Sequence, residues 1–311
     1  MWKYILKRLG MMIFVVLGVA IVIFSIMYFV PGDPAQIILG SSATPEQVEY
    51  LRETMGLNKS YLAQLGIFLR DTFLRWDFGT SYMTKSSIIQ EIGVRFPRTL
   101  QLALWSMIVS VVVGLPLGIV AAVHQGRWQD NAAILVSMLG LSIPGFWLAL
   151  MMVLLFSVKL GWLPAYGVGG WEYYVMPVLS NCLGNIAMNA RQTRSAMLDV
   201  IRSDYVTTAR AKGVSERNVI YKHALPNALI PIITLLGTGF GASLGGTVIV
   251  ESVFVMPGIG NYMTSAITNL DYPVVRGSVV ILAIVFSFIM LVVDLIYAYV
   301  DPRIKAQYVG K

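Results

Sequence analysis

The sequence contains little cysteine, histidine or charge. Its single cysteine, Cys182, excludes an internal disulfide, and two histidines, His124 and His223, are too few to suggest a metal-ligand cluster. Only 13% of the 311 residues are charged, whereas 57% are hydrophobic. This balance is too apolar for a water-soluble domain, and we therefore expect the lipid bilayer to be the main solvent of the chain.

Long apolar segments are the main feature that the sequence does have. A hydrocarbon core of ~30 Å requires about 20 apolar residues in a helix. Six segments approach that length, at residues 9–30, 99–123, 132–158, 176–190, 228–250 and 277–300. The fourth is the shortest and the most polar. The predicted fold class is an all-α polytopic membrane protein of six transmembrane helices.

The distribution of basic residues predicts the orientation. With both termini in the cytoplasm, the inner segments carry 14 of the 23 basic residues: Lys3, Lys7, Arg8, Arg127, Arg191, Arg194, Arg202, Arg210, Lys212, Arg217, Lys222, Arg303, Lys305 and Lys311. Cytoplasmic loops of membrane proteins are enriched in such residues. The net charge of +7 therefore indicates topology rather than nucleic-acid binding. The first apolar segment has no small-residue cleavage site after it and predicts an uncleaved anchor.

The topology divides the chain into three parts. Residues 1–30 form the cytoplasmic end and the first transmembrane helix, residues 31–97 an extracytoplasmic segment, and residues 98–311 a five-helix core. In the second part, Thr44, Pro45 and Gln47 predict a capped helix that ends at Gly56. A second amphipathic helix follows at about residues 60–75. These helices could cap the bundle, take part in gating or contact a receptor.

The inner segment at residues 191–225 is basic and is patterned as two short helices. Ser203 or Asp204 can cap the first, which ends at Gly213, and Ser215 can cap the second. The segment could be a solvated basic loop near anionic headgroups. Alternatively, it could dock a protein partner through six apolar side chains in a hydrophilic stretch, namely Tyr205, Val206, Ala209, Val219, Ile220 and Tyr221.

Polar residues in the apolar segments are candidates for a translocation path. Asn181, Asn185 and Asn189 share one face of the fourth segment and could line a hydrated path or hydrogen-bond a neighbouring helix. Glu251, after the fifth segment, could contact cargo or act in gating, or it could be a boundary residue solvated by headgroups. Two groups of glycines at four-residue spacing predict close helix packing: Gly114 and Gly118, and Gly237, Gly241 and Gly245.

Several motifs resemble the permease subunits of bacterial ABC importers, in the dipeptide, oligopeptide and nickel branch. In the inner segment, Ala209, Gly213, Leu225 and Pro226 match the loop by which these permeases engage their ATPases, whereas Thr207, Thr208 and His223 depart from it. Further motifs recur in order along the chain: Pro31-Gly-Asp-Pro34, Asp77-Phe-Gly79, Gly161-Trp-Leu-Pro164, Glu251-Ser-Val-Phe254, Pro257-Gly-Ile-Gly260 and Asp271-Tyr-Pro273.

The resemblance implies a MetI-like fold in the bacterial inner membrane and a role in ATP-driven import of peptides. It implies a second homologous permease, two ABC ATPases and an extracytoplasmic solute-binding protein as partners. ATP and Mg would bind the ATPases, because this chain has no phosphate loop and is expected not to be an enzyme. The expected ATPase-coupling residues are Asp204, Tyr205, Ala209, Arg210, Lys212, Gly213, Leu225 and Pro226. The alternatives are a nickel-complex importer of the same family and a stand-alone secondary carrier or channel.

Overall fold

A computed structural model describes residues 2–40 and 42–300 of the chain, without the side chains at 2–4, 230, 234, 242 and 296–300. Within this range the chain is helical and contains no strand, apart from an isolated antiparallel bridge between Thr80 and Ser87. The inner basic residues expected at 303, 305 and 311 lie outside the described residues. The all-α fold class is therefore confirmed for the described chain.

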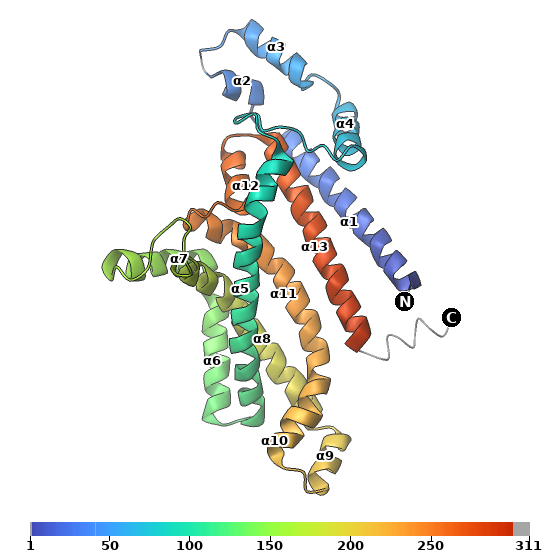
Figure 1. Cartoon of the computed structure of the whole chain (residues 1–311), viewed down its shortest axis with the longest axis vertical. Coiled ribbons are helices and arrows are strands. Elements are labelled where there is room, and N and C mark those ends of the chain that lie inside the picture. Colours follow the sequence, from blue (N-terminus) through green and yellow to red (C-terminus); the bar gives the residue numbers. More distant parts are fainter. Residues whose placement is uncertain (1, 41, 301–311) are drawn as a thin grey trace. The chain divides into compact units, whose positions relative to one another are not determined.

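The helices follow one another without intervening strands (Figure 1). Their bounds are α1 (Trp2–Phe29), α2 (Pro34–Leu39), α3 (Pro45–Met55), α4 (Tyr61–Leu74), α5 (Ile88–Val123), α6 (Trp128–Ser142), α7 (Gly145–Met152), η1 (Val153–Lys159), α8 (Glu172–Ile201), α9 (Asp204–Ala211), α10 (Glu216–Asn218), η2 (Val219–Ala224), α11 (Leu225–Val253), α12 (Ile259–Thr268) and α13 (Tyr272–Val300).

The chain forms two compact units. In the described chain, the first unit contains residues 2–4, 100–256 and 289–300, and the second contains residues 5–99 and 257–288. We refer to the first as the core unit and to the second as the outer unit, as names for these residues and not for a position. The predicted boundaries after residues 30 and 97 divide the chain by membrane topology and not into compact units. They stay a prediction.

Four described helices are long and apolar enough to span a membrane, and a bent pair adds a fifth candidate. The pair is α6 with α7 and η1, which are bent by 91° at the break around Pro144. The sequence predicted one segment at 132–158, but Pro144 lacks an amide hydrogen and interrupts the helix. Helix α8 has 30 residues, enough for ~45 Å, but it is too polar to qualify by composition. The predicted count of six is not confirmed.

The two helices predicted within residues 31–97 are confirmed. The side chain of Thr44 accepts a hydrogen bond from the Gln47 amide, the Gln47 side chain accepts one from the Thr44 amide, and Gly56 ends α3 in the left-handed conformation. In the outer unit, α4 packs its aromatic face on α1, with the ring of Phe68 5.5 Å from that of Phe24. The short helix α2 was not predicted from the sequence.

Close packing at two of the predicted glycines decides how α5 meets α8 in the core unit. A Cβ atom on Gly118 would lie 2.5 Å from both the carbonyl oxygen of Ala190 and the Cβ of Thr193, and one on Gly114 would lie 2.9 Å from Asn189. On α11, a Cβ on Gly237 would overlap Val293. These contacts confirm the packing interpretation at those three positions, whereas Gly245 has open space beside it.

We expect Gly118→Ala to destabilise the chain by about 1–3 kcal/mol, because the added methyl group overpacks a backbone contact. Unfolding can be followed in detergent with a thiol-reactive dye, since Cys182 is fully buried and is the only cysteine. Gly184→Ala in α8 is the matched control, because a Cβ atom there meets nothing within 4 Å. The Gly118 prediction is wrong if both variants unfold at the same temperature.

Candidate coupling and translocation sites

Helix α9 and the turn after it form the first part of the candidate coupling element, within the core unit. Ser203 occupies the N-cap position of α9 without a side-chain hydrogen bond to it, and Gly213 follows the helix with φ of +79°. A left-handed residue at this position suits glycine, which lacks a Cβ atom. The turn is closed by the Gly213 amide, which donates to the Arg210 carbonyl at 2.9 Å.

The second short helix continues into a membrane-spanning one instead of ending. Helix α10 begins after Ser215, as predicted, and passes through η2 directly into α11. Figure 1 shows α9 and α10 at one end of the α8 and α11 pair of the core unit. The candidate coupling element therefore continues into α11 rather than forming a free loop.

Only part of the apolar surface expected for a partner is exposed. Tyr205 and Tyr221 are 45% and 53% exposed. The other four side chains expected there are buried in a cluster that also contains Met197 and Ile232: Val206, Ala209, Val219 and Ile220. These four side chains attach α9 to η2 and are unavailable to a partner, because the two short helices bury their apolar faces against each other and against α8.

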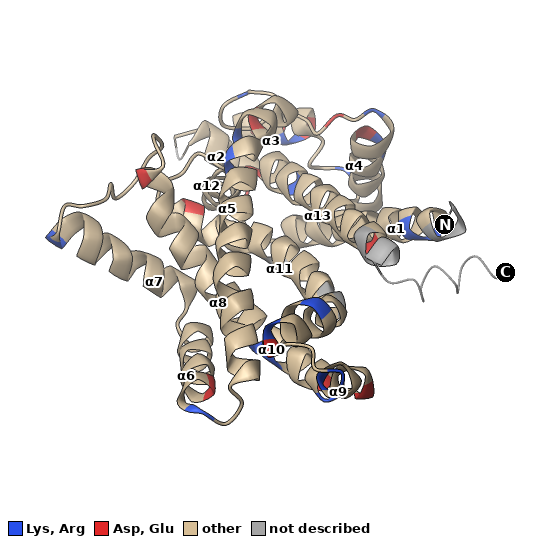
Figure 2. Ribbon diagram, turned by 60° about the horizontal axis from the view of Figure 1, so that its bottom comes forward, with Lys and Arg blue, Asp and Glu red and all other residues tan. Residues whose placement is uncertain are grey.

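The exposed side of the element is polar and charged. Figure 2 shows Lys and Arg gathered on α9, α10 and the segments beside them. Asp204, Arg210, Lys212 and Pro226 are exposed, whereas Leu225 is partly buried against the apolar cluster. The hydroxyl of Tyr205 accepts a hydrogen bond from Asn227 at 2.9 Å, which fixes its ring at the start of α11.

An ion pair connects α9 with α10 across the glycine turn. The Nη2 and Nε atoms of Arg210 lie 2.7 and 3.1 Å from the carboxylate oxygens of Glu216. The Arg210 guanidinium lowers the pKa of Glu216, so the pair stabilises the fold above the unfolded pKa of about 4.3. That contribution is lost as the pH falls through the lower folded pKa. Both side chains are exposed, and we expect the effect to be small.

A buried ion pair at the same end of the core unit was not recognised in the sequence. Asp130 at the start of α6 is 2% exposed. Its Oδ1 and Oδ2 accept hydrogen bonds from Arg194 of α8 at 2.5 and 2.8 Å, and Oδ2 also accepts one from the Gly126 amide at 2.9 Å. A carboxylate next to an apolar segment was the only sign of this pair in the sequence. Its partner Arg194 could not be recognised, because it lies 64 residues further along the chain.

The three asparagines of α8 hydrogen-bond serines on the neighbouring helices. Asn181 and Asn189 donate to Ser106 and Ser110 of α5 at 3.1 and 3.3 Å, and Asn185 donates to Ser243 of α11 at 2.8 Å. A cavity of about 10 Å³ lies beside Asn185 and Asn189, and it has room for about one water molecule. Helix pairing is therefore observed, and a path along these amides remains a prediction.

Glu251 lies in the apolar interior rather than at a solvated boundary. The residue is 1% exposed near the end of α11, and its neighbours in sequence, Val250 and Phe254, belong to a buried apolar cluster with Met176. The interpretation of Glu251 as a group solvated by headgroups is therefore wrong. A buried carboxyl is costly unless it is paired, and the role of Glu251 in gating or cargo contact stays a prediction.

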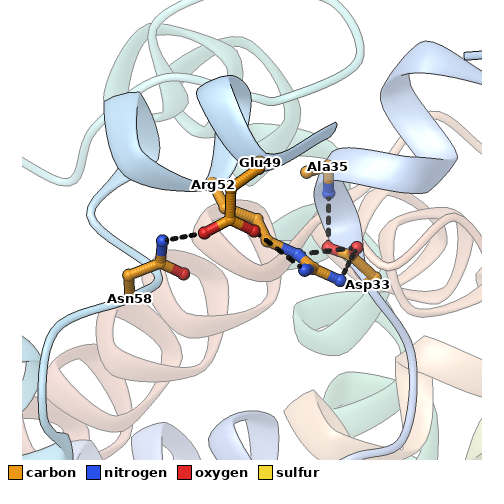
Figure 3. Close-up of polar contacts among 5 residues, drawn as sticks. All are labelled: Asp33, Ala35, Glu49, Arg52 and Asn58. Atoms are coloured by element: carbon orange, nitrogen blue, oxygen red, sulfur yellow. Dashed lines mark hydrogen bonds and ion pairs between the residues drawn. The ribbon is translucent and has the colours of Figure 1, made fainter. Parts of the chain in front are cut away.

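Two of the motifs that carried the family resemblance organise the outer unit. Asp33 caps α2 by accepting a hydrogen bond from the Ala35 amide, and it pairs with Arg52 of α3 at 2.7 Å (Figure 3). Asp271 is 3% exposed and accepts hydrogen bonds from the Ser81 hydroxyl at 2.5 Å and the Tyr82 amide at 2.9 Å. Asp33 therefore joins α2 to α3, and Asp271 joins the segment before α5 to the start of α13.

The chain belongs to the family of inner membrane components of binding-protein-dependent transport systems. The model of that component matches residues 114–306, and the model of its N-terminal part matches residues 1–103. The predicted recognition of an ABC-importer permease is thereby confirmed. It follows that this chain is a multi-pass inner membrane protein and that the family works with a binding protein.

Two named permeases and one solved structure are similar to this chain. The dipeptide transport system permease protein DppB of Alkalihalophilus pseudofirmus is 41% identical over 98% of this chain and 100% of its own length. The glutathione transport system permease protein GsiC of Salmonella choleraesuis is 40% identical, with 98% of this chain and 99% of that protein covered. A chain of the inward-facing MetNI methionine ABC transporter shares the fold, with a TM-score of 0.55, 20% identity, and 68% of this chain and 97% of that chain covered.

Proposed function

We propose that this chain is a membrane-spanning permease subunit of an importer that takes up di- or oligopeptides across the bacterial inner membrane. The observation that carries the proposal is the similarity over 98% of the chain to permeases named for dipeptide and glutathione transport. Permeases with nearly the whole chain in common share one architecture, and peptides are the cargo class that both names have in common.

The energy for transport comes, in this proposal, from ATP bound with Mg by two partner ATPases. The chain itself contributes the coupling element of residues 204–226. Its exposed charges and tyrosines favour a protein partner, and its buried cluster supports transmission of partner motion to α11, because η2 runs into α11 without a break. A second homologous permease completes the path, and a solute-binding protein delivers cargo on the opposite side.

The orientation that supports this arrangement has both termini in the cytoplasm. It places the basic residues of α9 and α10 inside and residues 31–97 outside, in line with the enrichment of Lys and Arg in cytoplasmic loops. A cysteine introduced at exposed Glu46 of a Cys182→Ala chain tests it. We expect a membrane-impermeant thiol reagent to label position 46, but not one introduced at Arg217, in intact spheroplasts.

Uptake by the reconstituted assembly tests the function itself. The four-subunit assembly in proteoliposomes, supplied with its binding protein, is expected to accumulate labelled dialanine with ATP but not with a non-hydrolysable analogue. Labelled glutathione and nickel ions are the comparison cargoes. Accumulation without ATP would identify a secondary carrier or channel instead, and nickel uptake without peptide uptake would overturn the peptide assignment.

The asparagine face of α8 gives a prediction for the translocation path. We expect simultaneous change of Asn181, Asn185 and Asn189 to Leu to lower peptide uptake at least about tenfold, because an aqueous path would lose its polar wall. Capture of the ATPases should be retained, since the coupling element is untouched.

The matched control changes the partners of the same hydrogen bonds, Ser106, Ser110 and Ser243, to Ala. Interhelical hydrogen bonds in membranes are worth about 0.6 kcal/mol each on average, so these changes should affect uptake only modestly. Equal losses in the asparagine and serine variants would show that the amides act only in helix pairing.

A further inference from the structure

The outer unit contains a cavity of about 780 Å³ that the coupling and path residues do not touch. Its wall is built from the end of α1, the segment from α2 to α4, residues 77–82 after α4, and the start of α13. Small-molecule sites commonly have volumes of about 300–1,000 Å³. The cavity is therefore large enough for a small peptide with some of its water.

Arg276 of α13 supplies a cation on this wall that has no carboxylate partner among residues 2–40 and 42–300. Its guanidinium carbon lies 5.3 Å from the ring centre of Phe24 and 5.2 Å from that of Phe68, and its Nε donates to the Tyr272 carbonyl at 3.4 Å. A guanidinium is always charged and offers five N–H donors. A cation held against aromatic rings and away from carboxylates is suited to bind an anionic group.

Two tyrosines of the wall, Tyr82 and Tyr272, interact electrostatically with Arg276. Tyr272 is 8% exposed, and its buried hydroxyl forms no hydrogen bond with any described residue. Burial raises the pKa of Tyr82, while the positive charge of Arg276 opposes that shift. Since a buried hydroxyl without a partner costs free energy, Tyr272 is available as a donor to the same anion that Arg276 would bind.

Carboxylates line other parts of the cavity wall. They are Asp33, Glu53, Asp71 and Asp77. Asp33 is joined to Arg52, which also contacts Glu49, as Figure 3 shows, and Arg70 keeps the pKa of Asp71 below its usual value. Ionised carboxylates at the wall favour a ligand that also carries a positive group. Arg52 and Lys59 are further cations of the wall, and Arg52 is paired with Asp33 and Glu49. Because cations and carboxylates line the same cavity, it suits a zwitterion.

We propose that this cavity binds a small peptide, with the terminal carboxylate at Arg276 and Tyr272 and the terminal ammonium group toward the acidic wall. The identity of the ligand class rests on the proposed function, whereas the location rests on the cavity and its side chains. The site lies within one unit, in residues of the predicted extracytoplasmic segment and of the helix ends that line the cavity with it.

The test measures equilibrium binding of labelled dialanine to the purified full chain in nanodiscs, without ATP or partners. Competition by unlabelled dialanine is compared with that by its C-terminal amide, which lacks the carboxylate. We expect the amide to bind at least about tenfold more weakly, the usual scale for loss of a charge-assisted hydrogen bond. Arg276→Gln should reduce that ratio to about one.

Arg75→Gln is the matched control, since Arg75 belongs to the same unit but does not line the cavity. Dye access to Cys182 verifies the folding of each variant. If the Arg276 variant does not fold, the comparison of dialanine with its amide on the unaltered chain tests the site. Equal affinity for acid and amide, or an unchanged ratio in folded Arg276→Gln, would overturn the site. The binding measurements do not depend on uptake. Failure of the peptide site can therefore be distinguished from failure of the proposed function.

The anionic group that binds at Arg276 could instead be a carboxylate of the solute-binding protein. If the chain does not bind dialanine, but Arg276→Gln weakens capture of the purified binding protein while Arg75→Gln does not, the anion belongs to that protein. That outcome overturns the small-peptide site.

Discussion

Gly213→Pro is expected to lower ATP-driven peptide uptake roughly a hundredfold. Proline fixes φ near −65°, whereas Gly213 has φ of +79°, and the change also removes the amide that closes the turn on Arg210. A misplaced proline costs ~3 kcal/mol or more, which corresponds to about two orders of magnitude in the population of the native turn. The measurement is uptake together with ATP hydrolysis by the reconstituted assembly.

Gly213→Asn is the matched control, because asparagine tolerates the left-handed conformation better than other residues with a Cβ atom. We expect it to retain most of the uptake. If uncoupling is the cause of the proline defect, ATPase subunits will still hydrolyse ATP while transport fails. Normal uptake by the proline variant would show that the geometry of this turn does not couple hydrolysis to transport.

Arg194→Met is expected to destabilise the core unit by about 3 kcal/mol. The change leaves Asp130, which is 2% exposed, with the Gly126 amide as its remaining hydrogen-bond donor. Breaking a buried ion pair by removing one partner typically costs about 3–5 kcal/mol, and the 24% exposure of the Arg194 side chain favours the lower end. The temperature at which Cys182 becomes accessible to the thiol dye measures the loss.

A double variant, Asp130→Leu with Arg194→Met, should recover much of the lost stability, because it removes the uncompensated charge together with its partner. Arg75→Met is the control, since that side chain is 64% exposed and pairs with Asp71 at the surface. We expect little change there. A double variant as unstable as Arg194→Met alone would mean that packing by the arginine stem, and not the ion pair, stabilises the contact between α6 and α8.

Helix ends were predictable where short-range signals determine them. Thr44, Pro45 and Gln47 formed the expected capping box, and Gly56 and Gly213 ended their helices in the left-handed conformation. Each signal acts over a few residues, so the local sequence contains it completely. The break at Pro144 was not predicted, although a proline is a local signal of the same kind. Its 91° bend has no local signal, because the direction after a break depends on what the next helix packs against.

Burial was the least predictable property of the candidate sites. Val206 and Ala209 were expected to face a partner, and Glu251 was expected near solvent, yet all three are buried. A hydrophilic neighbourhood in the sequence does not reveal which side of a short helix another helix covers. The ion pair of Asp130 with Arg194 was missed because its members are 64 residues apart, and no local pattern links them.

The sequence by itself determined that this chain is a helical membrane protein and a permease of the ABC-importer type, because apolar length, basic-residue distribution and ordered motifs are properties of the linear chain. Only the tertiary structure decided which polar groups meet: the asparagines of α8 with serines of α5 and α11, the acidic start of α6 with Arg194, and Arg276 with two aromatic rings at a cavity. Such pairings depend on the contacts between helices, and these are fixed by packing rather than by neighbouring residues.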